Sequence, residues 1–472
     1  MTFELLLAHA DTCRPALHPG LDESALHSSP LARSDPKPKR LWDALGDLDD
    51  LRAQRWGVVY PKTPEGERLL ELIEPLRELR QREQGGAPVH TYAVTPGMDW
   101  EEAHRWKARV LGSEQVEEPD RPRYLLVLGD LNEVSLELQQ VLATDALVGR
   151  LAFADEAGYR AYVAKVLRWA EAPSPVDRAR LLFYTSRDGT NATELGYRKL
   201  VEPCLDTCTR HQRTGALQVE PPRSLADDGA AEGSTLGRFL AHAAGAEPAV
   251  LLSVSHGLGV REGGWMSVED QRALQGALLL PGHERLTAAE VAARPFLPGG
   301  LWFCFACFSG GTPARSAYAP WLGDLDPDQA ERVARLLPRP GEPSFIAALP
   351  QAALANPQGP LAVVGHVDLA WTASFNDQGR SRHERFLGVI KALASGRRAG
   401  TALSSLLRFA NETSASLASS YHQERGALAA GRQYKASPAE RAHLWMLYHD
   451  LASHVLLGDP AVRLPLKHGG TR

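Results

Sequence analysis

Short apolar runs alternate with longer amphipathic stretches along most of this chain, and this alternation constrains the fold more than any other feature. The apolar runs lie at residues 55–61, 89–94, 123–129, 148–151, 179–185, 216–220, 249–256, 301–308 and 361–367. Apolar residues recur at the spacing of one helix face at residues 66–84, 156–170 and 193–212. Strands that alternate with helices predict an α/β fold with a mostly parallel sheet and helices on both faces.

The alternation is interrupted once, at residues 172–175, where alanine and proline indicate a linker. We therefore expect a smaller α/β subdomain at residues 51–172 and a larger α/β domain at residues 176–466, whose last part is mostly helical. Residues 1–50 are predicted to form an irregular amino-terminal arm, because most of this stretch is rich in proline, serine and charged residues and shows no periodicity.

Composition excludes several classes of function. The net charge of −5 provides no basic field for nucleic acid or for an anionic membrane. No stretch approaches the roughly 18–20 apolar residues that cross a bilayer. The first apolar run contains Glu4 and follows no basic residue, which is not typical of a secretory signal. Five cysteines are too few for a disulfide framework, so we expect a cytoplasmic protein with reduced thiols. The charge and the lack of a long apolar stretch further predict no nucleic-acid partner and no membrane insertion.

Two apolar runs end in side chains that can carry nucleophilic chemistry. One ends at Ser255-His256-Gly257, and the other ends at Cys307, which small residues follow. Open α/β sheets bind ligands at the carboxyl ends of their strands. A cysteine beside a histidine can exist as a thiolate–imidazolium pair, which provides a nucleophile and a proton donor. Gly257 would let the backbone approach a substrate closely, so that its N–H can hold an oxyanion.

These motifs resemble the His-Gly and Ala-Cys-x-Ser-Gly motifs of the caspase–gingipain clan, and are most similar to those of its gingipain branch. The separation of His256 and Cys307 agrees with the spacing of about 50 residues given for caspases. Further similarity lies at residues 124–130, at residues 148–151, at Tyr159, Tyr162 and Lys165, and at residues 457–464. The resemblance implies a three-layer caspase-like fold, with residues 176–466 as its catalytic domain.

The resemblance also implies roles. Cys307 matches the nucleophile, His256 the general base and Gly257 the oxyanion-hole backbone, and this chemistry needs no metal and no cofactor. The expected activity is that of a cysteine endopeptidase on protein or peptide substrates, by limited proteolysis of a partner protein. The expected partners are a co-encoded protein substrate or a regulatory partner. Gingipains are secreted, so the absence of a recognisable signal makes intracellular bacterial caspase-like peptidases the better match.

The chain leaves another apolar run at Asp368, and Trp371 follows closely. In the clan this edge helps to line the pocket for the residue before the cleaved bond. Asp368 could there select a basic side chain, with Trp371 and Ser255 as further substrate-binding residues. The alternative for Asp368 is a solvated carboxylate in a turn. His366 is expected to pack or to donate a hydrogen bond rather than act as a second base.

Other interpretations of the same residues are weaker. Cys304 and Cys307 could form half of a zinc site or a redox pair, with Cys204 and Cys208 as a second half, but residues three apart on a strand point to opposite faces. Acidic residues alternate as in a calcium loop but lack its glycine and distal glutamate, which favours a helix entrance; they are Asp324, Asp326 and Asp328. No serine-hydrolase elbow or phosphate-binding loop is present.

Two questions stay open at this level. A non-catalytic interaction module could use the same fold and bind a partner protein in the same crevice. Residues 259–300, between the two motifs, include paired glycines and could form a mobile cover over the site.

Overall fold

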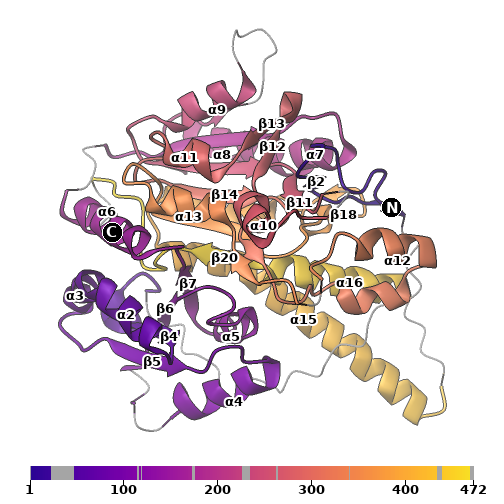
Figure 1. The fold of residues 1–472 in the computed structure, drawn as a ribbon, viewed down its shortest axis with the longest axis horizontal. Coiled ribbons are helices and arrows are strands. Elements are labelled where there is room, and N and C mark those ends of the chain that lie inside the picture. Colours follow the sequence, from indigo (N-terminus) through magenta and orange to yellow (C-terminus); the bar gives the residue numbers. More distant parts are fainter. Residues whose placement is uncertain are drawn as a thin grey trace.

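A ten-stranded sheet runs through the whole molecule (Figure 1). The computed structural model describes residues 2–22, 47–113, 116–117, 120–172, 176–225, 234–261, 264–339, 341–432 and 438–467. From one edge to the other, the strands are β5 (His90–Val94), β4 (Trp56–Pro61), β6 (Tyr124–Leu128), β7 (Leu147–Leu151), β20 (His454–Leu457), β17 (Ala362–His366), β14 (Leu301–Phe305), β10 (Ala249–Val254), β8 (Arg180–Thr185) and β9 (Arg223–Ser224). Neighbouring strands are parallel except at the β17–β20 pair, so the predicted mixed α/β class with a mostly parallel sheet is confirmed.

Most of the predicted strands coincide with observed ones, and two differences stand out. Residues 216–220 form only a single bridge, between Val219 and Ala179, and the edge strand β9 follows them. Leu217 and Val219 are buried, which explains the apolar residues of this segment although it does not pair as a strand. The central strand β20 comes from the stretch that was expected to be mostly helical.

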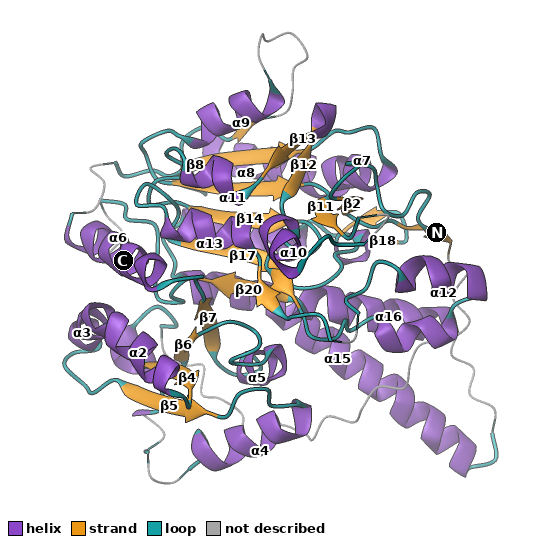
Figure 2. Ribbon diagram, viewed as in Figure 1, coloured by secondary structure: helices purple, strands orange, loops and turns teal. Residues whose placement is uncertain are grey.

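Helices surround the sheet (Figure 2). On β4 and β6, alternate residues enter different cores, because successive strand side chains point to opposite faces. Val58 and Leu126 join the main core, whereas Val59 and Val127 join a second core on the other face. The helices are α1 (Leu51–Gln54), α2 (Pro64–Leu72), α3 (Glu74–Glu83), α4 (Trp100–Val110), α5 (Leu136–Leu142), α6 (Glu156–Glu171), α7 (Asn191–Gly196), α8 (Glu202–Arg213), α9 (Thr235–Ala243), α10 (Val268–Leu274), α11 (Ala288–Ala292), α12 (Pro327–Ala334), α13 (Ala348–Ala355), α14 (Glu384–Ala394), α15 (Ala399–Ala429) and α16 (Pro438–Ala452).

Polar caps decide where several helices begin. The Thr63 hydroxyl accepts a hydrogen bond from the Gly66 N–H at 3.1 Å at the start of α2, where Pro64 has no N–H that needs a partner. At the start of α4, Asp99 and Glu102 each accept from the other's backbone N–H in a capping box. None of the helices that the structure describes is long and apolar enough to cross a membrane.

The two halves of the sheet meet where β20 lies beside β7. A Cβ atom on Gly149 would lie 2.3 Å from the Gly458 carbonyl oxygen, so only glycine permits this contact. The Tyr162 hydroxyl accepts from the Asp459 N–H at 2.7 Å and donates to the Leu361 carbonyl at 2.8 Å. Several motifs that carried the family resemblance therefore fasten the two halves together.

The amino-terminal arm differs from the irregular segment that was expected. Within its described part, β1 (Thr2–Phe3) pairs with β3 (Leu21–Asp22). β2 (Leu7–His9) joins a small four-stranded sheet in the order β13 (Glu284–Leu286), β12 (Leu278–Leu280), β11 (Gly257–Gly259) and β2. Residues 23–46 of the arm and residues 173–175 of the proposed linker lie outside the described residues.

Candidate active site

The two sequence motifs leave the sheet side by side. β10 and β14 are adjacent parallel strands, and Val254 is in register with Phe305. His256 follows the end of β10, and Cys307 follows the end of β14. Because the carboxyl ends of parallel strands lie at the same edge of a sheet, both residues are at the edge where open α/β sheets bind ligands.

Gly257 brings the two motifs into direct contact. A Cβ atom at this position would lie 1.9 Å from the Cys307 carbonyl oxygen and 3.1 Å from the Cys307 nitrogen. A side chain would therefore force the His256 and Cys307 segments apart. The glycine in the His-Gly motif is required by packing against the cysteine backbone.

A strained turn follows the thiol. Phe308 has a φ of 56°, in the left-handed region that bulky residues rarely adopt. Its N–H donates to the Asp368 carbonyl at 2.9 Å, and Asp368 itself has a φ of 100°. Two strained positions thus hold each other beside Cys307, as is common where a reactive side chain is held in place.

His256 is almost completely buried and is held by a polar loop that follows β8. Its Nε2 lies 3.0 Å from the Thr190 hydroxyl and 3.5 Å from an Asp188 carboxylate oxygen. Burial lowers the pKa of His256, while the charges of Asp188 and Glu4 act in the opposite direction. Its Nδ1 is buried and finds no hydrogen-bond partner among the described residues.

Asp188 and Thr190 were missed by the sequence analysis. Asp188 accepts hydrogen bonds from the hydroxyls of Thr190 and Thr193, at 2.8 Å and 2.7 Å, which fix its carboxylate beside the histidine. A signal for them was present, because a polar cluster directly follows the apolar run at residues 179–185. The rule that identified His256 and Cys307, polar residues at the carboxyl end of an apolar strand, applies to this run as well.

The Cys307 side chain is fully buried against the segment that follows β17. Its Sγ accepts from the Ala370 N–H at 3.2 Å and lies 3.6 Å from the Ala370 carbonyl oxygen. Burial raises the pKa of the Cys307 thiol, and the negative charges of Asp450 and Asp368 act in the same direction. In this closed arrangement the sulfur is therefore held as a neutral thiol.

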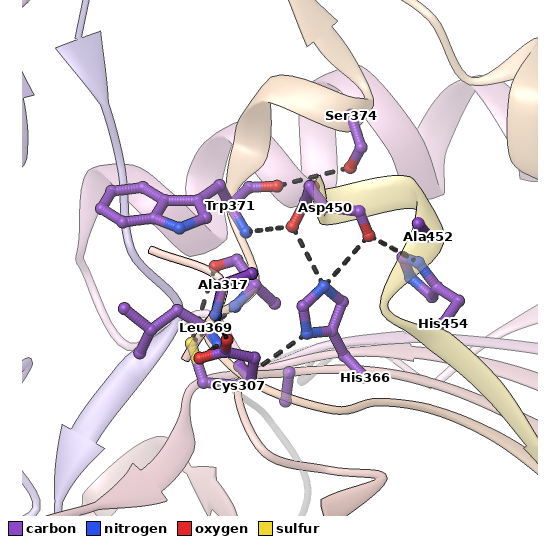
Figure 3. A network of polar contacts seen from close by, with 12 residues as sticks. Cys307, Ala317, His366, Leu369, Trp371, Ser374, Asp450, Ala452 and His454 are labelled. Carbon is purple, nitrogen blue, oxygen red and sulfur yellow. Dashed lines mark hydrogen bonds and ion pairs between the residues drawn. The ribbon is translucent and has the colours of Figure 1, made fainter. Parts of the chain in front are cut away.

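A buried polar network lies behind Cys307 (Figure 3). The Asp450 carboxylate, from α16, accepts from the Trp371 N–H at 2.8 Å and lies 3.2 Å from His366 Nε2. The other ring nitrogen of His366 lies 3.1 Å from the Asp368 carbonyl oxygen. His366 has the hydrogen-bonding position that was expected for it, and Asp450, which the sequence analysis did not single out, helps to fix the segment that contacts the thiol.

The Asp368 carboxylate is buried and bound to the protein itself. It accepts hydrogen bonds from the Ser316 hydroxyl at 2.9 Å, the Ala317 N–H at 2.8 Å and the Leu369 N–H at 2.8 Å. A solvated turn carboxylate, the alternative considered from the sequence, is excluded by its 2% exposure. The three internal donors leave this carboxylate less able to pair with a substrate charge.

Stability should depend on pH through Asp368. Burial raises the pKa of its carboxyl from 3.8 to about 6, although the Ser316 hydrogen bond acts in the opposite direction. The folded protein therefore keeps this proton at pH values where the unfolded chain has lost it, so the free energy of unfolding falls as the pH rises from about 4 to about 6. We expect Asp368→Asn to remove about 3 kcal/mol of this fall, measured by denaturant unfolding across the pH series. Parallel pH curves for the two proteins would contradict the prediction.

Ser255 and Trp371, the other proposed substrate-binding residues, make internal contacts. The Ser255 hydroxyl is fully buried and donates to the Leu279 carbonyl of β12. The Trp371 ring is fully buried and packs edge-on against Tyr318 and Trp321, with ring centroids 5.8 Å and 5.7 Å apart. The backbone of Trp371 forms an antiparallel bridge with Leu5 of the amino-terminal segment.

The amino-terminal segment closes the site. The Leu6 carbonyl oxygen accepts hydrogen bonds from the Gly257 N–H at 2.8 Å and from the Cys307 N–H at 3.2 Å. Cys307 and His256 are 0% and 1% exposed beneath this segment. A peptide carbonyl of the chain itself therefore occupies the position between the two motifs.

The cysteines considered for a zinc or redox site, and the acidic residues considered for a calcium loop, take part in packing and helix capping. Cys304 is buried in β14, and burial raises the pKa of its thiol to about 12. Cys204 and Cys208 are buried on α8. No group of three or more metal-binding side chains lies together within the residues that the structure describes. Asp326 accepts from the Gln329 N–H at 3.1 Å and caps α12, which confirms the predicted helix entrance.

Comparison with known proteins gives distant structural matches. No protein-family model and no curated protein matches the chain. A solved structure described as a protease gives a TM-score of 0.48 at 10% identity and covers 87% of this chain and 78% of its own. The complex of the pro- and mature domains of RgpB from Porphyromonas gingivalis gives 0.47 at 12% identity, with 87% and 79% covered. The Arg-specific cysteine proteinase gingipain R gives 0.47 at 11% identity, with 88% and 78% covered. The chain is a mixed α/β protein whose distant structural matches include cysteine proteinases, and any chemistry assigned to it rests on its own residues.

Proposed function

We propose that this chain is a cysteine endopeptidase with Cys307 as nucleophile and His256 as general base. One observation carries the proposal: the Gly257 and Cys307 N–H groups converge on a single peptide carbonyl oxygen, that of Leu6. Two backbone donors aimed at one carbonyl oxygen form the arrangement that stabilises the oxyanion of acyl transfer. The thiol belongs to the same residue as one of these donors.

The reaction follows from this arrangement. His256 takes the proton of the Cys307 thiol, and the sulfur attacks the carbonyl carbon of the bound peptide. The Gly257 and Cys307 N–H groups hold the oxygen as it becomes negative. His256 then protonates the leaving amine, and water hydrolyses the thioester. No metal or cofactor is required for these steps.

Asp188 and Thr190 are proposed as positioning residues for His256. They hold Nε2, so Nδ1 is the ring nitrogen that is left for proton exchange with the thiol. A carboxylate beside the ring also stabilises the imidazolium that forms during the attack. Burial lowers the pKa of His256 and raises that of Cys307, so both groups favour their neutral forms before the attack.

The oxyanion assignment predicts the effect of Gly257→Ala. The added methyl group would displace the Cys307 backbone and with it both donors. We expect kcat to fall by about 10²–10³-fold, with a smaller change in KM, because donors of this kind act mainly in the transition state. Gly149→Ala, at the junction of β7 and β20, is the matched control for loss of folding, because a Cβ there would also meet a carbonyl oxygen, at 2.3 Å. Equal losses in the two variants, measured by peptide hydrolysis, would contradict the assignment.

Selective alkylation tests the nucleophile. Leu6→Asp would place an unpaired carboxylate in a fully buried position, so we expect it to drive the segment out of the site. In that variant Cys307 should react with iodoacetamide at least about tenfold faster than the other four cysteines, and His256→Ala should remove the difference. The control is Leu6→Asp combined with Cys307→Ala, which opens the same site but lacks the thiol.

The same experiment separates the peptidase from a non-catalytic interaction module. A binding module would show no preferred thiol and no dependence on His256. Limited proteolysis of a partner protein stays the expected biological use of the site. The preference for basic residues that Asp368 suggested from the sequence is the alternative to an apolar preference, because this carboxylate already accepts three internal hydrogen bonds. Peptides that differ only in the residue before the cleaved bond separate the two.

A further inference from the structure

The segment that closes the site is bound along both sides of the proposed nucleophile. On one side, the Leu6 N–H donates to the Ala370 carbonyl at 3.4 Å, and the Thr372 N–H donates to the Glu4 carbonyl at 3.3 Å. Leu5 bridges antiparallel to Trp371 between them. These contacts make an extended strand, which is the form in which a peptide adds to the edge of a binding site.

On the other side of the carbonyl, the chain continues as β2. Leu7 and His9 pair in parallel with Gly257 and Gly259 of β11. The Ala10 N–H also donates to the Gly259 carbonyl at 3.2 Å. The bond after Leu6 therefore passes through the middle of a clamped strand, as the cleaved bond of an endopeptidase substrate must.

The side chains of this segment are bound as well as its backbone. Leu5, Leu6 and Leu7 are each at most 1% exposed, and all three belong to the main hydrophobic core. Glu4 is also buried, and its carboxylate accepts from the Asn191 amide at 2.9 Å. Asn191 directly follows the loop that holds His256.

We propose that the Leu6–Leu7 bond is a self-processing site and that the active site selects leucine before the cleaved bond. The inference rests on the proposed peptidase function. The Leu6 carbonyl is already between the two oxyanion donors, and the residues on both sides of it are held in an extended form. The first substrate of the enzyme is then its own amino-terminal segment.

The reaction balances without any further reactant than water. The Cys307 sulfur forms a thioester with the Leu6 carbonyl carbon, and the bond from that carbon to the Leu7 nitrogen breaks. His256 carries the thiol proton to the Leu7 amine. Water then hydrolyses the thioester, which leaves a carboxylate on Leu6 and restores the thiol. The part of the chain that ends at Leu6 is released, and β2 stays paired with β11.

Release of this part would open the site. Glu4, Leu5 and Leu6 supply the contacts that now cover the strand end at Cys307, whereas Leu7 stays within the small sheet. The Asp368 carboxylate accepts three internal hydrogen bonds, so it is less available to pair with a basic substrate side chain. Leucine rather than arginine is therefore the expected residue before the cleaved bond.

Self-processing is tested on the full chain by intact mass and by sequencing of the new amino terminus. Wild type should lose the residues up to Leu6 and gain a terminus at Leu7, and Cys307→Ala should stay intact. Leu6→Met should still be processed, because methionine is apolar, similar in volume to leucine and not branched at Cβ. Leu6→Asp should not be processed, yet it should hydrolyse an added peptide.

The added peptides are two fluorogenic substrates that differ in one residue, Glu-Leu-Leu and Glu-Leu-Arg before the fluorophore. We expect Leu6→Asp to prefer the leucine peptide by at least about tenfold in kcat/KM. Peptide hydrolysis without a new terminus at Leu7 in wild type, or faster cleavage after arginine, would overturn this inference and leave the peptidase proposal standing. If wild type gains no new terminus at Leu7 and neither peptide is hydrolysed by wild type or by Leu6→Asp, both proposals fail.

Discussion

Cys307→Ala is expected to abolish peptide hydrolysis, with a fall in kcat/KM of about 10⁴-fold or more. The sulfur is the only group of the protein that forms a bond to the substrate in the proposed reaction, so no remaining side chain can replace it. The rate would be measured with the leucine peptide in the Leu6→Asp background, where the amino-terminal segment no longer covers the site.

Cys304→Ala is the matched control. Cys304 lies in the same strand region and is buried, but its thiol makes its contacts with Ser253 and Ser309 in the core. We expect this variant to lose some stability and to keep most of its activity. A residual rate in Cys307→Ala that is close to that of Cys304→Ala would contradict the assignment of the nucleophile.

Asp459→Ala is expected to lower the free energy of unfolding by about 3–5 kcal/mol. Asp459 is fully buried and contacts Arg80 at 2.6 Å, the Trp56 indole N–H at 3.0 Å and the Ala461 N–H at 2.9 Å. Its removal would leave the buried guanidinium and an indole N–H without their acceptor. Denaturant unfolding measures the effect.

Glu83→Ala is the control for Asp459→Ala. Glu83 is the other carboxylate beside Arg80, at 2.7 Å, but its side chain is 29% exposed. Water can replace part of what Glu83 supplies, so we expect a clearly smaller loss of stability. Equal losses of unfolding free energy in the two variants would contradict the prediction that the buried carboxylate contributes more to stability than the partly exposed one.

Local patterns predicted the strand ends of the site. The runs that end at His256 and Cys307 are apolar because β10 and β14 are buried on both faces, and the polar residues that follow are conspicuous for that reason. The same reasoning places the two residues at one edge of the sheet, since both strands are parallel. The contact between Gly257 and Cys307 depends on the approach of two segments and leaves no trace in either run.

Other parts of the site depend on contacts between distant segments. Asp450 lies near the end of α16, where its sequence neighbours indicate only a helix. Its role beside His366 and Trp371 follows from how α16 packs against the sheet, which no local pattern encodes. The strand pairing of residues 2–10 could not be predicted from their short apolar run. Their partners lie more than two hundred residues away, in β11 and at residues 370–372.

The position of β20 has a consequence for how the chain is made. This strand lies between β7 and β17 in the middle of the sheet, yet it comes from the last part of the sequence. During synthesis on the ribosome, both neighbours therefore present unpaired edges until residues 454–457 have emerged. A chain that is cut short before β20 would keep these edges open to strands of other molecules, so truncation at the carboxyl end should cause aggregation rather than a smaller folded protein.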